Sequence, residues 1–205
     1  MGTQSDLAQS SSSLELALFP LHTVLFPGGP LPLRIFEPRY LDMVRRCMRE
    51  ASTFGVVQIR AGAEAGSAVT STASIGTSAR IADFYPLSDG MLGLLCLGGR
   101  KFRLLQRWCR DDGLNVGRVE WLSEEPSIRL PSEHRRLGTL VEHVLPRLGE
   151  LYEAVERHAE DASWVSFRLA EILPLGLDEK QRWLEISDPL ERLAQLAPLI
   201  RRDMA

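Results

Sequence analysis

The stretch LALFPLHTVLFPGGPLPLRIFEPRYLDMVRRC, residues Leu16–Cys47, decides much of the fold. It holds five of the twelve prolines of the 205-residue chain, set between short apolar runs. Proline fixes φ and lacks a backbone donor, so this stretch cannot form a regular central strand or helix. We expect extended pieces joined by fixed bends. Such a scaffold has a defined shape and places apolar side chains at set points, and it contains no row of catalytic groups.

Alternation and turn signals around this stretch predict a β-rich first half. Leu31, Leu33 and Ile35 alternate with Pro32 and Arg34, which is typical of a half-buried edge strand. A proline at residue 38 suits the first turn of a helix, and apolar residues follow it at three- and four-residue spacing. Further strands are expected at residues 54–59, 75–85, 91–97, 102–109 and 116–122, with a loop over 61–74 and turns at 88–90, 98–99 and 111–113. Successive hairpins of this kind predict an antiparallel, barrel-like sheet.

After residue 131 the apolar period becomes helical. A long stripe runs from Leu137 to Val155, and Pro146 inside it predicts a kink or a split. A second stripe covers residues 164–172. Patterns that resemble capping boxes begin at Asp178 and Asp188 and predict two more helices. The second half is therefore predicted to be a small helical bundle.

These patterns divide the chain into four parts. We predict a mobile polar tail over 1–13, a β-barrel unit over 14–122, a connector over 123–131 and a helical bundle over 132–205, which together make an α+β chain. The tail offers nothing to bury and is expected to be dispensable for stability. Trp121 and Trp164 stand on either side of the connector, and we expect them to pack across it.

Composition excludes several classes of protein. No run of eighteen apolar residues is present, and the polar, serine-rich start does not resemble a secretory signal. The net charge of −3 is not that of a strongly phosphate-binding protein. The three cysteines form no C-x-x-C pair and the four histidines no H-x-x-x-H pair. We expect a cytoplasmic protein without metal, cofactor or membrane contact, and the oligomeric state is left unassigned.

Three blocks of sequence resemble the amino-terminal, substrate-binding domain of Lon proteases. They are FPL-x-TVLFPGG-x-LPLRIFEPRYLDMV, then IGTSARIADFYPLSDGMLGLLCLGGRKFRLL over residues 75–105, and WVSFRLAEILPLGLDEKQRWLEISDPLERLAQL over residues 164–196. The blocks stand in the family's order and cover most of the chain. The resemblance implies a PUA-like antiparallel β-barrel with one helix, followed by a helical extension. It also implies recognition of exposed apolar segments in unfolded or partner proteins.

The resemblance extends to the binding part of a Lon protease only. A full Lon protease carries an ATPase module and a Ser-Lys proteolytic domain after this region. This sequence has no Walker A motif, and neither Lys101 nor Lys180 lies in anything like the family's catalytic segment. We expect a stand-alone, bacterial-type binding domain that is not an enzyme. A peptidase label on it would be inherited from the larger protein.

The candidate binding residues lie around the proline-shaped loop. Leu25 and Phe26 precede the bend at residues 27–29, while Phe36 and Tyr40 flank the helix start. A rigid loop can hold apolar side chains outward at little ordering cost, as a peptide-binding groove requires. The alternative is that these side chains plug the barrel against the helix as core residues.

An RNA-binding PUA-like module is the alternative function, because the PUA-like fold also occurs in RNA-binding proteins. Strand alternation would send Lys101, Arg103 and Arg107 to one side of a hairpin. This patch is modest, and Trp108 is the one neighbouring aromatic residue that could stack on a base. Nucleic acid is therefore the less favoured partner.

Overall fold

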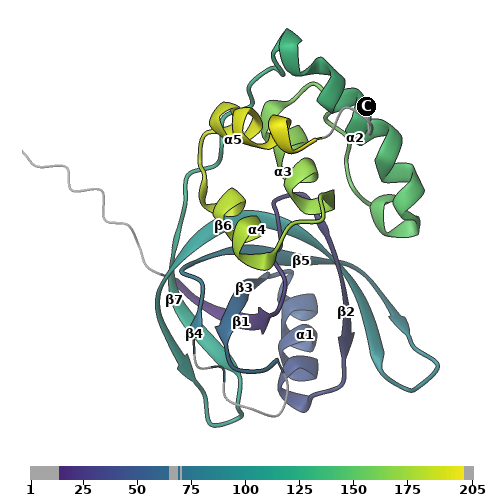
Figure 1. The fold of residues 1–205 in the computed structure, drawn as a ribbon. Coiled ribbons are helices and arrows are strands. Elements are labelled where there is room, and N and C mark those ends of the chain that lie inside the picture. The colour runs from purple at the N-terminus through teal and green to yellow at the C-terminus, as the bar shows by residue number, and fades with distance from the viewer. Residues whose placement is uncertain (1–13, 65–68, 70, 201–205) are drawn as a thin grey trace, which may run out of the picture.

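The structure is a computed structural model and describes residues 14–64, 69 and 71–200. The expected tail over 1–13 lies outside the described residues. A seven-stranded sheet forms first, and most of the helices follow it in sequence (Figure 1). This α+β arrangement confirms the predicted fold class.

The strands pair mainly with antiparallel neighbours. They are β1 (Leu14–Leu21), β2 (Pro30–Ile35), β3 (Phe54–Ala61), β4 (Ser71–Thr72), β5 (Ile75–Pro86), β6 (Leu92–Cys109) and β7 (Asn115–Trp121). Their order is β1-β7-β6-β5-β3-β4, and β2 pairs with β6 outside this path. β1 also pairs with β3, and this pair is parallel, unlike the hairpins that the sequence predicts. The short β4 forms inside the segment expected to be a loop.

The helices confirm most of the predicted signals. They are α1 (Pro38–Glu50), α2 (Arg135–Val144), α3 (Ala162–Ile172), α4 (Leu177–Glu185) and α5 (Pro189–Leu196). The predicted split at Pro146 is present, because α2 ends at Val144 and the 3-10 turns η2 (Leu145–Leu148) and η3 (Glu150–Tyr152) follow. Asp188 caps α5 through its side chain, whereas Asp178 already lies inside α4.

The expected turn at residues 98–99 is wrong, because β6 runs straight through it. Gly98 meets the bend at Pro27–Gly29: its N–H donates to the carbonyl of Gly29 at 2.8 Å, and its own carbonyl accepts from Gly28 at 2.7 Å. A Cβ on Gly98 would lie 2.1 Å from the carbonyl oxygen of Phe26. This glycine therefore allows two backbones to approach closely instead of reversing the chain.

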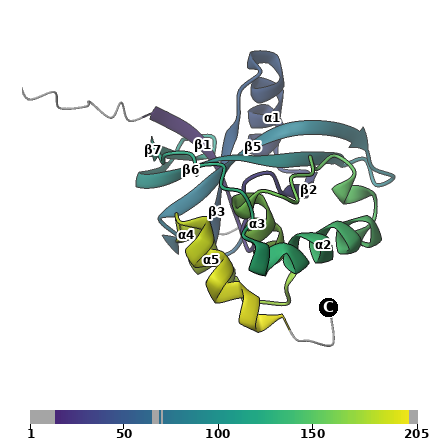
Figure 2. The same ribbon diagram turned by 90° about the horizontal axis from the view of Figure 1, so that it is seen from above.

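Helix α1 lies on one side of β5 and β6, and helices α2 to α5 lie on the other (Figures 1 and 2). α1 packs its buried face, which includes Met43 and Val44, against apolar residues of the sheet. Helices α2 to α5 form a second apolar cluster, which also takes in Val24, Phe26 and Ile75 from the first half of the chain. The proline-rich stretch thus contributes to both cores.

Buried charges also join the sheet to the helices. The Glu125 carboxylate follows β7 and accepts from Lys101 Nζ at 2.7 Å and from Arg192 Nη2 at 2.6 Å. Burial raises the pKa of Glu125, but the hydrogen bonds and charges of Arg192 and Lys101 outweigh it and hold the pKa below its ordinary value. Burial also lowers the pKa of Lys101, against the opposing effect of Glu125.

The expected pairing of two tryptophans across the connector is not what the structure shows. Trp121 packs edge-on to Phe102 in a cluster within the sheet, while Trp164 belongs to the helical cluster and lies near His158. Contacts between the two halves instead include Phe26 with Phe167 and Glu125 with Arg192.

Candidate binding groove

A groove of about 600 Å³ runs along β2. All six residues from Leu31 to Phe36 line it. Successive side chains of a strand point to opposite faces, so six consecutive residues share one groove only where it follows the edge of the strand. β2 pairs with β6 on one side and with no strand of the described chain on the other. The groove therefore lies along a free sheet edge.

The opposite wall of the groove comes from three other parts of the chain. Phe19, Leu21 and Thr23 contribute from β1 and the segment after it, Glu37 and Tyr40 from the start of α1, and Glu64 from the segment after β3. The lining is mostly apolar, and its volume is typical of ligand-binding clefts.

Phe36 is the open aromatic side chain of the groove, with 55% of its surface exposed. It lies between the end of β2 and Pro38, which begins α1, so the backbone around it is restricted. Tyr40 is buried in the wall, where its ring centroid lies 4.0 Å from that of Phe19. Burial raises the pKa of Tyr40, so its phenol stays neutral. The groove thus has a fixed wall and one exposed apolar contact.

The charges that line the groove are compensated except for one. Arg34 pairs with Asp89 on the β5–β6 connection, and Glu37 pairs with Arg39 at 2.7 Å. The Glu64 carboxylate accepts a hydrogen bond from the backbone N–H of His22. It forms no ion pair with any residue that the structure describes. Within the part of the chain that the structure describes, the groove therefore carries one negative charge without an ion-pair partner.

Two of the four predicted contact residues are buried elsewhere. Phe26 has no exposed surface, and its ring centroid lies 5.9 Å from that of Phe167 on α3. Leu25 is 4% exposed and packs in the core around α1. Their burial does not fit contact with a bound peptide. Phe36 and Tyr40 come together in the groove, and Phe36 is the one that a ligand can reach.

The predicted basic patch does not form one surface. Lys101 points under the helices, where it pairs with Glu125 and donates to the carbonyl of Leu184 at 3.1 Å. Arg107 is half-buried and donates to the side chain of Asn115 and to a backbone carbonyl at residue 69. Arg103 is exposed. Two causes separate these residues. The register irregularity of β6 between Leu104 and Gln106 breaks the alternation before Arg107. The residues at the end of α4 cover Lys101 but leave Arg103 exposed.

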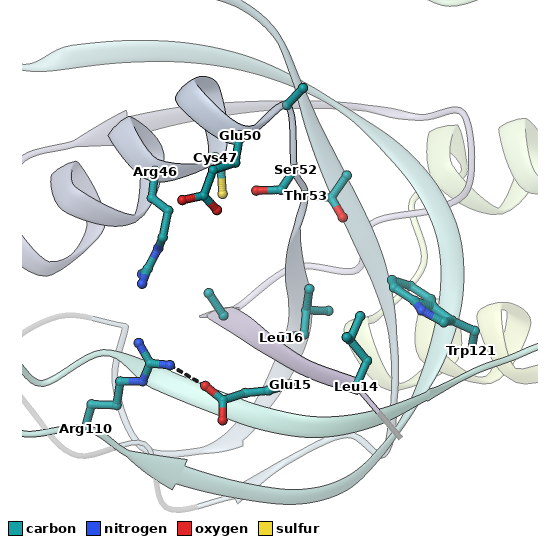
Figure 3. A pocket seen from close by; sticks show the side chains of 12 residues that line it. Leu14, Glu15, Leu16, Arg46, Cys47, Glu50, Ser52, Thr53, Arg110 and Trp121 are labelled. Atoms are coloured by element: carbon teal, nitrogen blue, oxygen red, sulfur yellow. Dashed lines mark hydrogen bonds and ion pairs between the residues drawn. The ribbon is translucent and has the colours of Figure 1, made fainter. Parts of the chain in front are cut away.

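A second pocket, of about 440 Å³, lies between β1 and the end of α1 (Figure 3). Arg46 and Arg110 point toward each other across it, and Arg110 pairs with Glu15. Burial raises the pKa of Cys47 at its edge, so this thiol is protonated and a poor nucleophile. In residues 14–64, 69 and 71–200, no group of three or more His, Cys, Asp or Glu side chains could hold a metal ion.

The sequence did not predict that Phe19 and Glu64 line the groove. Glu64 lies in a segment of small and polar residues that gave no sign of a defined position, and Phe19 reads as an ordinary strand residue. The prolines of β2 do indicate that it is an edge strand. Its opposite wall depends on the parallel pairing of β1 with β3, for which no local signal exists.

Comparisons with known proteins identify the family. A family model described as the ATP-dependent protease La (LON) substrate-binding domain matches residues 15–202. The chain belongs to this family. A solved Lon N-terminal domain protein from Xanthomonas campestris is 39% identical, with a TM-score of 0.75, over 92% of this chain and 99% of that one.

More distant members share the fold. The N-terminal domain of a Lon protease from the Mycobacterium avium complex is 16% identical, with a TM-score of 0.61, over 90% of this chain and 97% of that one. Lon protease 2 of Myxococcus xanthus is 25% identical over 194 residues, which are 91% of this chain and 23% of that protein. The chain thus spans about a quarter of the length of the curated Lon proteases that it matches. No helix in the described part of this Lon-family chain is long and apolar enough to cross a membrane.

Proposed function

We propose that the chain is a non-catalytic protein-binding module that holds exposed apolar segments of unfolded or partner proteins in the groove along β2. Membership of a substrate-binding domain family supports protein binding in general. The observation that carries the finer proposal is Phe36, an exposed aromatic side chain on a restricted backbone in a largely apolar groove. Aromatic side chains in such positions commonly dominate binding energy.

Substitution of Phe36 tests this proposal against a matched control. Phe84 on β5 is exposed to nearly the same extent, 53% against 55%, and does not line the groove. We expect Phe36→Ala to weaken binding of fluorescently labelled, unfolded casein by about 30-fold, as at an interface hot spot. Because Phe36 is exposed, the free energy of unfolding should change by less than about 1 kcal/mol.

The control tests whether binding depends on this groove or on any exposed aromatic side chain. Phe84→Ala should leave the dissociation constant for casein within about two-fold of the unmodified protein. Equal losses in both variants, or none in either, would contradict the assignment of the groove. Anisotropy titrations measure binding, and urea melts measure stability.

The absence of catalysis is tested separately. We expect the purified protein, incubated with casein, ATP and magnesium, to release no more peptide or phosphate than a heat-inactivated sample, because the sequence has no Walker A motif. Reproducible cleavage or hydrolysis above that control would contradict the non-catalytic assignment.

A further inference from the structure

The free edge of β2 has a defined hydrogen-bonding pattern. In an antiparallel ladder the N–H and C=O of one residue point to the same side, and successive residues alternate between the two sides. Pro30 and Pro32 stand opposite Leu97 and Leu95 of β6 and have no N–H to donate. They therefore suit the outward positions, and Arg34, two residues further on, shares their side.

The outward edge is consequently rich in acceptors. It presents the carbonyl oxygens of Pro30, Pro32 and Arg34 but only one donor, the N–H of Arg34. Prolines of this kind discourage a second copy of the same edge from pairing, because two acceptor-rich edges cannot satisfy each other. A segment with ordinary peptide N–H groups can satisfy them. η3 lies beside β2, and the groove is lined by Leu31 to Phe36 but not by Pro30, so the open part of the edge is the part that ends at Phe36.

The side chains around this edge indicate which residues a bound segment would carry. Its apolar residues would face Phe36, Leu21 and the other apolar residues of the groove. Glu64 holds the uncompensated negative charge, which favours a lysine or arginine in the bound segment.

We propose that the groove takes its ligand as an added β-strand: an extended, apolar stretch of unfolded polypeptide that carries one basic residue and pairs with the free edge of β2. Backbone pairing supplies affinity that does not depend on sequence, and the groove adds a preference for apolar and basic side chains. This mode of binding deepens the proposed function and rests on it.

Backbone methylation of a peptide tests the pairing directly. The probe is a short, fluorescein-labelled peptide of alternating valine and serine around one arginine, in competition with unfolded casein. In an added strand only alternate N–H groups face β2. N-methylation of one alternate set should therefore weaken binding by at least about ten-fold, because it leaves buried carbonyls unpaired. Methylation of the other set should change binding by less than about three-fold.

The outcomes distinguish this inference from the proposed function. If both methylated peptides bind like the parent, or lose affinity equally, strand addition is wrong. If casein binds with the expected dependence on Phe36 while the parent peptide neither binds nor competes, strand addition fails and the proposed function stands. If casein itself does not bind, both fail.

Two substitutions examine the edge from the protein side. Arg34→Pro and Arg34→Ala both remove the ion pair with Asp89, but only the proline removes the outward N–H. Arg34→Pro should bind the peptide about five-fold more weakly than Arg34→Ala, with similar melting temperatures because the ladder to β6 is intact. Equal affinities of two folded variants would contradict the pairing.

Glu64→Gln tests the charge preference. It should weaken binding of the arginine peptide by about three-fold and leave a peptide with glutamine in place of arginine unaffected. An equal effect on both peptides would overturn the part of the proposal that concerns the basic residue.

Discussion

Phe26 joins the sheet to the helices at the scale of a single residue. Its ring is enclosed in the helical cluster beside Phe167, and its carbonyl oxygen accepts from the N–H of Gly29 at 2.9 Å. The backbone of this one residue therefore closes the bend, and its side chain attaches the bend to α3. Removal of the ring would leave a cavity at the contact between the two halves.

We expect Phe26→Ala to lower the free energy of unfolding by about 3–5 kcal/mol, as for other buried aromatic residues. Urea melts, with Phe36→Ala as the exposed counterpart, measure the difference. Similar small losses in both variants would contradict the core position of Phe26.

The sequence alone could not separate these two phenylalanines. Both are large apolar residues within two positions of a proline, since Phe26 directly precedes Pro27 and Phe36 precedes Glu37-Pro38. Neither hydrophobicity nor the nearby proline says which of the two is buried. The difference arises from α3, which lies far along the chain and covers only Phe26. Burial of this kind is a tertiary property with no local signal.

At the scale of an element, β6 shows that a pair of glycines does not always mark a turn. The pair Gly98-Gly99 has the composition of a turn, yet β6 continues through it. Gly90 does occupy a turn, with φ of +80° and no atom within 4 Å of a Cβ placed on it. The two positions therefore make a matched pair.

We expect Gly98→Ala to destabilise the protein by at least about 2 kcal/mol, because its Cβ would collide with backbone that cannot move alone. Gly90→Ala should cost only about 1 kcal/mol, from its positive φ. Thermal melts of both variants give the comparison, and a larger loss at Gly90 would contradict it.

Most elements were predictable because their signals are local. The helix after Pro38, the split at Pro146 and the cap at Asp188 each depend on a few neighbouring residues. The misread features depend on distant ones: the parallel β1–β3 pair, and the position of Glu64 across the groove. Of the candidate groove, the sequence therefore predicted the edge strand β2 and placed Phe36 and Tyr40 near it, while their role in binding stays a prediction.

At the scale of the whole molecule, Glu125 links the sheet to the helices. It follows the last strand of the sheet and pairs with Arg192 on α5, which has no exposed side-chain surface. The guanidinium also lies 3.6 Å from the centroid of the Phe167 ring. Loss of the carboxylate would leave Arg192 and Lys101 buried without a counter-charge.

We expect Glu125→Gln to cost about 3–5 kcal/mol at pH 7. The folded-state pKa of Glu125 is below its ordinary value, so its stabilisation is present above that ordinary pKa. It is lost as the pH falls through the folded-state pKa, so the gap between the two proteins should shrink in acid.

Urea melts from pH 7 down to acid measure this gap. The exposed neighbour Glu124 supplies the control, since Glu124→Gln removes a carboxylate from the same connector without a buried partner. A gap between the unmodified protein and Glu125→Gln that does not change with pH would contradict the role of this carboxylate.

The pairing of β1 has a consequence for synthesis on the ribosome. Its residues Leu14 to Leu18 pair with Val119 to Asn115, so the first strand is completed by the last strand of the sheet. Translation delivers the parallel neighbour β3 (Phe54–Ala61) first and β7 (Asn115–Trp121) only about 50 residues later. During that interval one edge of β1 is unpaired on the nascent chain. A member of a substrate-binding domain family thus itself passes through a stage in which it exposes an unpaired strand edge.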